Sequence, residues 1–143
     1  MPPILLAALL AVVAVPLWAS PCEVRFRAGV VAYLAQARAL RALQAEVYGP
    51  AAWVSATHVL ARLEAHSALT GACEELALVQ ARIAALVPLL ERAESETRLA
   101  VALCFGINRD RATDNLAAIA EAARVLADEV AFLDATARAC RPP

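Results

Sequence analysis

The stretch DNLAAIAEAARVLADEVAFLDATARAC, residues 114–140, decides the fold class of this chain. Its apolar residues recur in steps of three and four, which puts them on one face of an α-helix because 3.6 residues complete a turn. Thr113 stands directly before the stretch as an expected N-cap, and the run 107–112 before it is polar and reads as a loop. We therefore predict a helix over 114–140. Its apolar face consists of Leu116, Ile119, Ala123, Leu126, Val130, Leu133, Ala137 and Cys140.

The same period runs through residues 72–105. Pro88 lacks a backbone N–H and is expected to kink this helix, whereas the pair Arg92 and Glu96 has the i,i+4 spacing that supports a continuous one. We predict a single helix over 72–105, kinked at Pro88. Its apolar face consists of Ala72, Leu76, Val79, Ile83, Leu86, Leu90, Ala93, Thr97, Ala100 and Cys104.

Two further helices are expected over 21–48 and 51–69. Ser20-Pro21-Cys22-Glu23 fits a capping box with proline at the first helical position, and Gly49-Pro50 ends that helix. The predicted inner face of 21–48 is Phe26, Val30, Tyr33, Ala37, Leu40, Gln44 and Val47, and that of 51–69 is Trp53, Ala56, Leu60, Leu63 and Ser67. With no strand pattern and short links, the sequence predicts an all-α, up-down-up-down antiparallel four-helix bundle.

One layer of this bundle is expected to hold the small residues Ala37, Ala93 and Ala123 at nearly the same height, facing Leu60 or Leu63. Such a layer either lets the helices approach closely or leaves a void for an apolar guest. Close approach is the preferred interpretation.

The first nineteen residues contain no charged side chain and are mostly apolar up to Ala19. This pattern is typical of a secretory signal peptide, and we expect cleavage after Ala19, which leaves residues 20–143 as one domain. An uncleaved membrane anchor is the alternative, although Ile4 to Ala19 is short for a spanning helix and contains Pro16.

Composition excludes several classes of protein. At 143 residues and 62% hydrophobic composition the chain has room for one packed domain. Thirteen basic residues, all of them Arg, balance fourteen acidic ones to a net charge of −1, without the basic patch of a nucleic-acid binder.

Four cysteines in an exported chain favour disulfides, so Cys22, Cys73, Cys104 and Cys140 are the candidates. If each helix carries the chain to the opposite end of the bundle, three of them share one end and Cys104 lies at the other. The geometry then predicts a Cys22–Cys140 bond. Cys104 is expected to be a buried thiol or the link of a covalent homodimer.

Cys22 near the start of the mature chain and Cys140 near its end resemble the terminal cysteine pairing of erythropoietin-like helical cytokines. The resemblance implies a secreted helical ligand. The short Gly49-Pro50 link departs from that family, whose up-up-down-down bundle needs a long crossover there.

Five residues form the predicted recognition surface. His58, Arg62 and His66 follow one another at i,i+4 on helix 51–69, and Arg109 and Arg111 lie in the polar loop before the last helix. The two histidines are about 12 Å apart along the axis and cannot bind one metal ion.

No catalytic, cofactor-binding or metal-binding motif occurs in the sequence. We therefore expect a secreted or surface-displayed helical interaction module without catalytic activity, whose partner is a protein. The alternatives are a carrier of a small apolar ligand in the bundle core and a cytokine-like ligand. No cofactor and no nucleic acid is expected, and membrane attachment only if residues 1–19 are retained.

Overall fold

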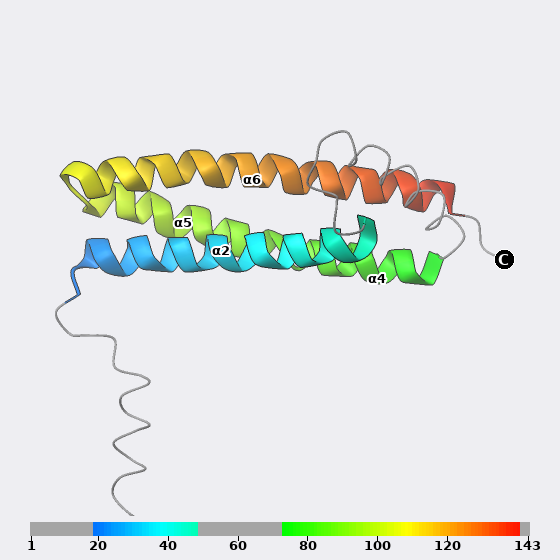
Figure 1. Cartoon of the computed structure of the whole chain (residues 1–143). Helices are drawn as coiled ribbons and strands as arrows, with labels where there is room; N and C mark the ends of the chain where they lie inside the picture. Colours follow the sequence, from blue (N-terminus) through cyan, green and yellow to red (C-terminus); the bar gives the residue numbers. More distant parts are fainter. Residues whose placement is uncertain (1–18, 49–72, 141–143) are drawn as a thin grey trace, which may run out of the picture.

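The computed structural model describes residues 19–48 and 73–140, which form four helices packed against one another (Figure 1). These helices are α2 (Pro21–Tyr48), α4 (Cys73–Ala84), α5 (Val87–Leu103) and α6 (Gly106–Ala139). No strand occurs within these two ranges. The predicted all-α class is confirmed, and the bounds of the predicted helix 21–48 match α2. Residues 1–18 and the predicted helix 51–69 lie outside the described residues.

The helices α4 and α5 follow each other along one line and together form a broken rod beside α2 and α6 (Figure 1). The helix α2 packs mainly on α5, and both α4 and α5 pack on α6. The start of α2 meets the end of α5, so these two helices are antiparallel. The chain then reverses and runs back along α6 (Figure 1).

The rod is interrupted at Ala85–Leu86, two residues before the proline that was expected to kink it. Leu86 turns the chain through a tighter bond from its N–H to the carbonyl of Ile83 (3.0 Å), and Pro88 then lies in the first turn of α5. A first-turn residue needs no intrahelical donor, so the proline costs nothing there. One kinked helix over 72–105 is therefore wrong in detail: the segment is two helices.

The last helix begins earlier than predicted. Phe105 is the extended N-cap residue, and Gly106 begins α6 with φ of 56°, in the region that favours glycine. The polar run 107–112, expected to be a loop, is helical, and Thr113 lies inside the helix with its hydroxyl donating to the carbonyl of Arg109 (2.9 Å). The run contains no further Gly or Pro, so its polar side chains form a solvated helix face.

The start of α2 confirms the predicted cap. The backbone N–H of Glu23 donates to the Ser20 hydroxyl oxygen at 3.1 Å, and Pro21 takes the first helical position. In the first half of α2 the buried face is not the predicted one. Gly29, Ala32 and Gln36 are the buried residues there. Farther along the helix, Leu40 is buried as predicted.

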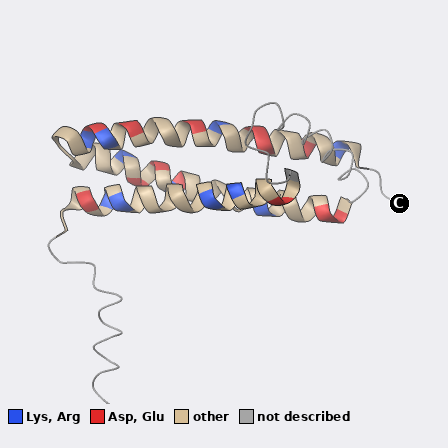
Figure 2. Cartoon of the chain, in the orientation of Figure 1, with Lys and Arg blue, Asp and Glu red and all other residues tan. Residues whose placement is uncertain are grey.

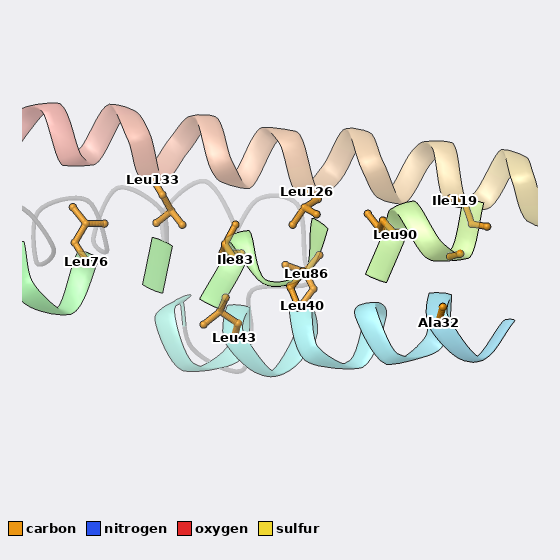
Figure 3. Close-up of a cluster of buried hydrophobic side chains, with 11 residues drawn as sticks. Ala32, Leu40, Leu43, Leu76, Ile83, Leu86, Leu90, Ile119, Leu126 and Leu133 are labelled. Carbon is orange, nitrogen blue, oxygen red and sulfur yellow. The ribbon is translucent and has the colours of Figure 1, made fainter. Parts of the chain in front are cut away.

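The core differs between the two ends of the bundle. At the end that contains Cys73 and Cys140, and through the middle, it is built from leucine and isoleucine (Figure 3). At the end that contains Cys22 and Cys104 the fully buried residues are the small Ala100, Cys104 and Ala112, against which the partly buried Phe26 and Val101 pack. The large members of the first cluster are Leu40, Leu43, Leu76, Ile83, Leu86, Leu90, Ile119, Leu126 and Leu133.

The predicted layer of three alanines does not form. Ala93 is fully buried, Ala37 is half-buried, and Ala123 is exposed. The three therefore do not meet in the interior, because Ala123 faces outward between α5 and α6.

Gly29 is a point of close approach between α2 and α5. A Cβ atom built on Gly29 would clash with the Thr97 hydroxyl oxygen and would lie 3.3 Å from the Thr97 nitrogen and 3.4 Å from the Ala93 carbonyl oxygen. Only glycine lets the two backbones come this close. The hydroxyl of Thr97 and the small side chain of Ala93 fill the contact.

Two glutamines of α2 lie in the core with opposite outcomes. The Gln44 amide nitrogen donates to the buried Glu129 carboxylate at 3.0 Å. Gln36 is buried more completely than Gln44, yet its amide nitrogen and oxygen have no hydrogen-bond partner among the described residues. A buried amide without partners loses its hydration on folding and gains nothing in return.

The disulfides join Cys22 to Cys104 and Cys73 to Cys140, with Cα atoms 4.9 and 5.8 Å apart. All four predicted cysteines are thus bonded, but the predicted Cys22–Cys140 pair is wrong. The predictions of a free Cys104 thiol and of a homodimer through Cys104 are also wrong, because Cys104 forms a disulfide within the chain and is only 1% exposed.

The physical reason lies in the direction of the third predicted helix. The prediction made segment 51–69 carry the chain back to the Cys22 end, so that Cys73 would start there. In the structure Cys73 starts α4 at the opposite end, in the half of the bundle where α2 stops (Figure 1). The described helices therefore form three rods, of which the middle one, α4 with α5, is antiparallel to α2 and α6, and one disulfide lies at each end of the bundle.

We predict that peptide mapping without reductant yields Cys22–Cys104 and Cys73–Cys140 peptides. Exchanging Cys73 and Cys140 together for Ser should lower the free energy of unfolding by about 4 kcal/mol, because the bond closes a long loop in the unfolded chain. Urea denaturation measures this loss. A Cys22–Cys140 peptide would contradict the arrangement of the three rods.

For the contact of α2 and α5, we predict that Gly29→Ala lowers the free energy of unfolding by about 1–3 kcal/mol, because the added methyl group overpacks the interface. Adding Thr97→Ala should recover part of this loss, since the clashing hydroxyl is removed. Ala35→Gly, at an exposed position of α2, serves as the control for helix propensity. A stabilised Gly29→Ala protein would show that the two helices are free to separate.

For the glutamine without partners, we predict that Gln36→Leu raises the free energy of unfolding by about 1–2 kcal/mol in thermal or urea denaturation, because it removes an unpaid desolvation cost. The matched variant Gln44→Leu should lower it, since Glu129 loses a buried donor. A loss of stability in Gln36→Leu would mean that ordered water satisfies the amide.

Candidate functional site

Exposed large apolar side chains gather at one end of the bundle. Of the nine in the described residues, seven lie in the half that contains Cys22 and Cys104. They are Val24, Val31, Leu34, Leu99, Leu103, Phe105 and Ile107. The fully buried residues of this half are small, whereas these large apolar side chains are exposed. Exposed large apolar side chains gathered in one region are typical of contact sites.

Leu103, Phe105 and Ile107 form the outermost part of this end, and we call them the apolar tip. Phe105 is 83% exposed and Ile107 65% exposed. Cys104 and Phe105 are both extended, so their side chains point in opposite directions: Cys104 points inward to its disulfide and Phe105 outward. The bond to Cys22 thus holds the turn on α2 and keeps Phe105 in solvent.

The predicted recognition residues Arg109 and Arg111 lie next to the apolar tip. Both are exposed in the first two turns of α6, and neither forms an ion pair with another described residue. Asp110 lies between them, so the local charge is mixed, as it is along all the helices (Figure 2). The other predicted members, His58, Arg62 and His66, lie outside the described residues.

A hollow of about 340 Å³ lies beside the tip, between α2 and the start of α6. Phe26 and Val30 supply its apolar lining, and Glu23, Arg27 and Asn108 its polar rim. The hollow lacks the arrangement of nucleophile and base that catalysis needs, since it contains one carboxylate and one guanidinium.

A groove of about 330 Å³ runs between α5 and α6, away from the tip. Its floor is made of the buried residues Leu90, Ile119 and Leu126. Its sides are the more exposed apolar residues Val87, Ala123, Ala127 and Val130. The sequence analysis had placed Ala123 in the core, and it lines this surface groove instead.

The α5 side of the groove is acidic. Glu91 and Glu94 line it, and none of the described residues that line the groove is cationic. The Glu94 carboxylate accepts from Arg98 at 2.7 Å, one helical turn along α5, whereas Glu91 has no ion-pair partner among the described residues. The groove therefore combines an apolar floor with a negative edge.

Among the described residues, Arg25 of α2 also pairs with the half-buried Glu96 of α5 at 2.9 Å, and two further ion pairs are exposed surface contacts. Arg82 forms two hydrogen bonds to Glu46, both at 2.8 Å, and lowers the pKa of the Glu46 carboxyl through these bonds and through its charge. Arg124 likewise lowers the pKa of Glu121 on α6. Exposed pairs of this kind add little to stability and are not catalytic acids or bases.

Within residues 19–48 and 73–140, no group of three or more His, Cys, Asp or Glu side chains is placed to hold a metal ion. The described helices include none that is long and apolar enough to cross a membrane. The buried pair Gln44 and Glu129 joins α2 to α6 inside the core.

Comparison with protein-family models, with curated proteins and with solved structures found no match to this chain. The groove between α5 and α6 and the apolar tip are therefore assessed on their own geometry. Sequence analysis found the arginines beside the tip but neither surface itself. The signal for the tip was present in Phe105-Gly106-Ile107, where two large apolar residues flank a glycine at a helix junction.

Proposed function

We propose that this chain is an exported helical interaction module without catalytic activity, whose groove between α5 and α6 binds an amphipathic helix of a protein partner. The observation that supports the proposal is the groove itself. It is an apolar channel between the neighbouring helices α5 and α6, open to solvent along one side, and its floor is made of buried core side chains. Helix-in-groove binding is a recurrent mode of peptide recognition.

The packing of the three rods favours a helix as the occupant. Two neighbouring antiparallel helices with an apolar seam offer the same surface that a fourth helix covers in a bundle. Val87, Ala123 and Ala127 stand along this seam and are already solvent-exposed, so covering them removes apolar surface from water. The small side chains of the two alanines leave room for large apolar residues of the partner.

The acidic residues beside the groove indicate which kind of partner helix fits it. Glu91 and Glu94 on the α5 edge favour a helix that carries Arg or Lys beside its apolar face, because opposite charges at the rim steer association and set orientation. The partner we propose is therefore a protein helix with an apolar stripe and a basic flank.

Export is supported by the cysteines and by the N-terminal sequence. Two disulfides fit an oxidising compartment, and residues 1–19 have the uncharged, apolar character of a signal peptide. We propose that the chain is secreted, or displayed at a surface if this segment is retained.

The alternatives have less support. A carrier needs an internal void, and the small pocket that Leu43 and Leu133 line between α2, α4 and α6 of the described residues amounts to about 10 Å³. That is room for about one water molecule and not for an apolar ligand. The cytokine-like alternative depended on a terminal Cys22–Cys140 pair, and both cysteines have other partners.

We predict that Ala123→Arg abolishes partner binding without loss of stability, because it places a large charged side chain in the groove at an exposed position. The full-length protein, immobilised, is offered a library of displayed extracellular domains, and binders are measured by surface plasmon resonance. The matched control is Ala117→Arg, which is also exposed on α6 but does not line the groove.

The proposed function requires binders that are kept by Ala117→Arg and lost by Ala123→Arg, with unchanged melting temperatures. Binders that tolerate Ala123→Arg but not Phe105→Ser would move the docking surface to the apolar tip. If Ala123→Leu raises the melting temperature and abolishes uptake of a hydrophobic dye, the groove holds a small ligand and the carrier alternative replaces our proposal.

A further inference from the structure

The apolar tip lies apart from the groove, and it indicates a second contact surface that is independent of the first. Leu103 is the last residue of α5, Phe105 lies between the helices, and Ile107 lies in the first turn of α6, all at the Cys22–Cys104 end of the bundle. None of the three lines the hollow or the groove described above. Exposed apolar side chains at the end of a bundle suit insertion into a soft apolar medium, which needs no matching groove.

The turn is built to keep this end exposed. The Cys22–Cys104 bond ties the residue before Phe105 to α2, and Gly106 with φ of 56° starts α6 immediately after it. The connection between α5 and α6 is therefore too short and too constrained to let Phe105 fold back onto the bundle. Phe105 and Ile107, held in this way, leave apolar surface in contact with water, which is unfavourable in free energy. Only an external apolar surface can cover it.

The course of the chain identifies that surface. Ser20 caps α2 beside Cys22, so the chain enters the described domain at the same end as the apolar tip. The residues immediately before it, 1–19, contain no charge and are mostly apolar. A bilayer that holds residues 1–19 would thus face Phe105, with only Ser20 and the first turn of α2 between them.

The charges near the tip are compatible with a bilayer surface. Arg109 and Arg111 lie within two turns of Phe105 and can extend toward lipid phosphates while their aliphatic stems stay with the apolar residues. Asp110 and Asp114 balance them, so the attraction does not depend on a strongly anionic membrane.

We propose that the apolar tip lies in the interfacial layer of the membrane that retains residues 1–19, and so holds the bundle upright on that membrane. The proposal concerns the surface-displayed form of the protein, and it is independent of what the groove binds. Leu103, Phe105 and Ile107 enter the layer of glycerol and upper acyl chains, and Arg109 and Arg111 meet the phosphates. The Cys73–Cys140 end then points away from the bilayer.

The test places one tryptophan at each end of the full chain. In a background with Trp18→Phe and Trp53→Phe, Phe105→Trp reports on the tip and Leu78→Trp, at a 67% exposed position of α4, on the opposite end. Both proteins are reconstituted into phosphatidylcholine vesicles with and without bromine on the acyl chains. We expect a blue-shifted emission that bromine quenches for the reporter at 105, and neither effect at 78.

Equal quenching of the two reporters, or none at 105, overturns the proposal. A blue shift at 105 without bromine quenching also overturns it, because the tip would then contact protein instead of lipid. Amide hydrogen exchange of the unsubstituted chain checks against disturbance by tryptophan: residues 103–108 should exchange more slowly in vesicles than in detergent, and residues 74–80 equally. Loss of groove binding by Ala123→Arg is unaffected by any of these outcomes, so the two proposals fail separately.

Discussion

The approach of α2 to α5 at Gly29 constrains the rest of the structure. Because the two backbones lie close together there, the contact has no room for a side chain on α2, and Ala93 and Thr97 of α5 fill it. The core at this end is thin in consequence. A thin core buries less apolar area, so the Cys22–Cys104 bond takes over part of the stabilisation that large side chains provide at the other end.

The same constraint produces the asymmetry of the surface. A chain with 62% hydrophobic residues whose fully buried cluster at this end consists only of Ala100, Cys104 and Ala112 has large apolar side chains left over. In this half they lie outside, as Val31 and Phe105 do. The close contact of α2 and α5 does not extend to α6, and the seam between α5 and α6 stays open as the groove that Ala123 lines.

Periodicity predicted the elements that the structure confirms. The faces of α4 and α5 carry the predicted residues from Leu76 to Cys104, and α2 has the predicted bounds, because heptad spacing and caps are local properties. The start of α6 was missed because polar residues without Gly or Pro suit a solvated helix as well as a loop. The disulfides were missed because they depend on the direction in which each helix runs, which no local pattern encodes.

The two candidate surfaces depend on that same long-range information. Ala123 belongs to a clean apolar stripe, and nothing in the stripe distinguishes a position under a neighbouring helix from one beside an open seam. Whether it is core or groove is decided by the positions of α5 and α6, which follow from Gly29 and the two disulfides. Cysteine pairing therefore determines the positions of the two proposed surfaces as well as the fold. Because Cys104 lies beside Cys22, Phe105 and the start of α2 are at the same end of the bundle. That end suits an apolar medium, and the groove on the side of the bundle suits a protein partner.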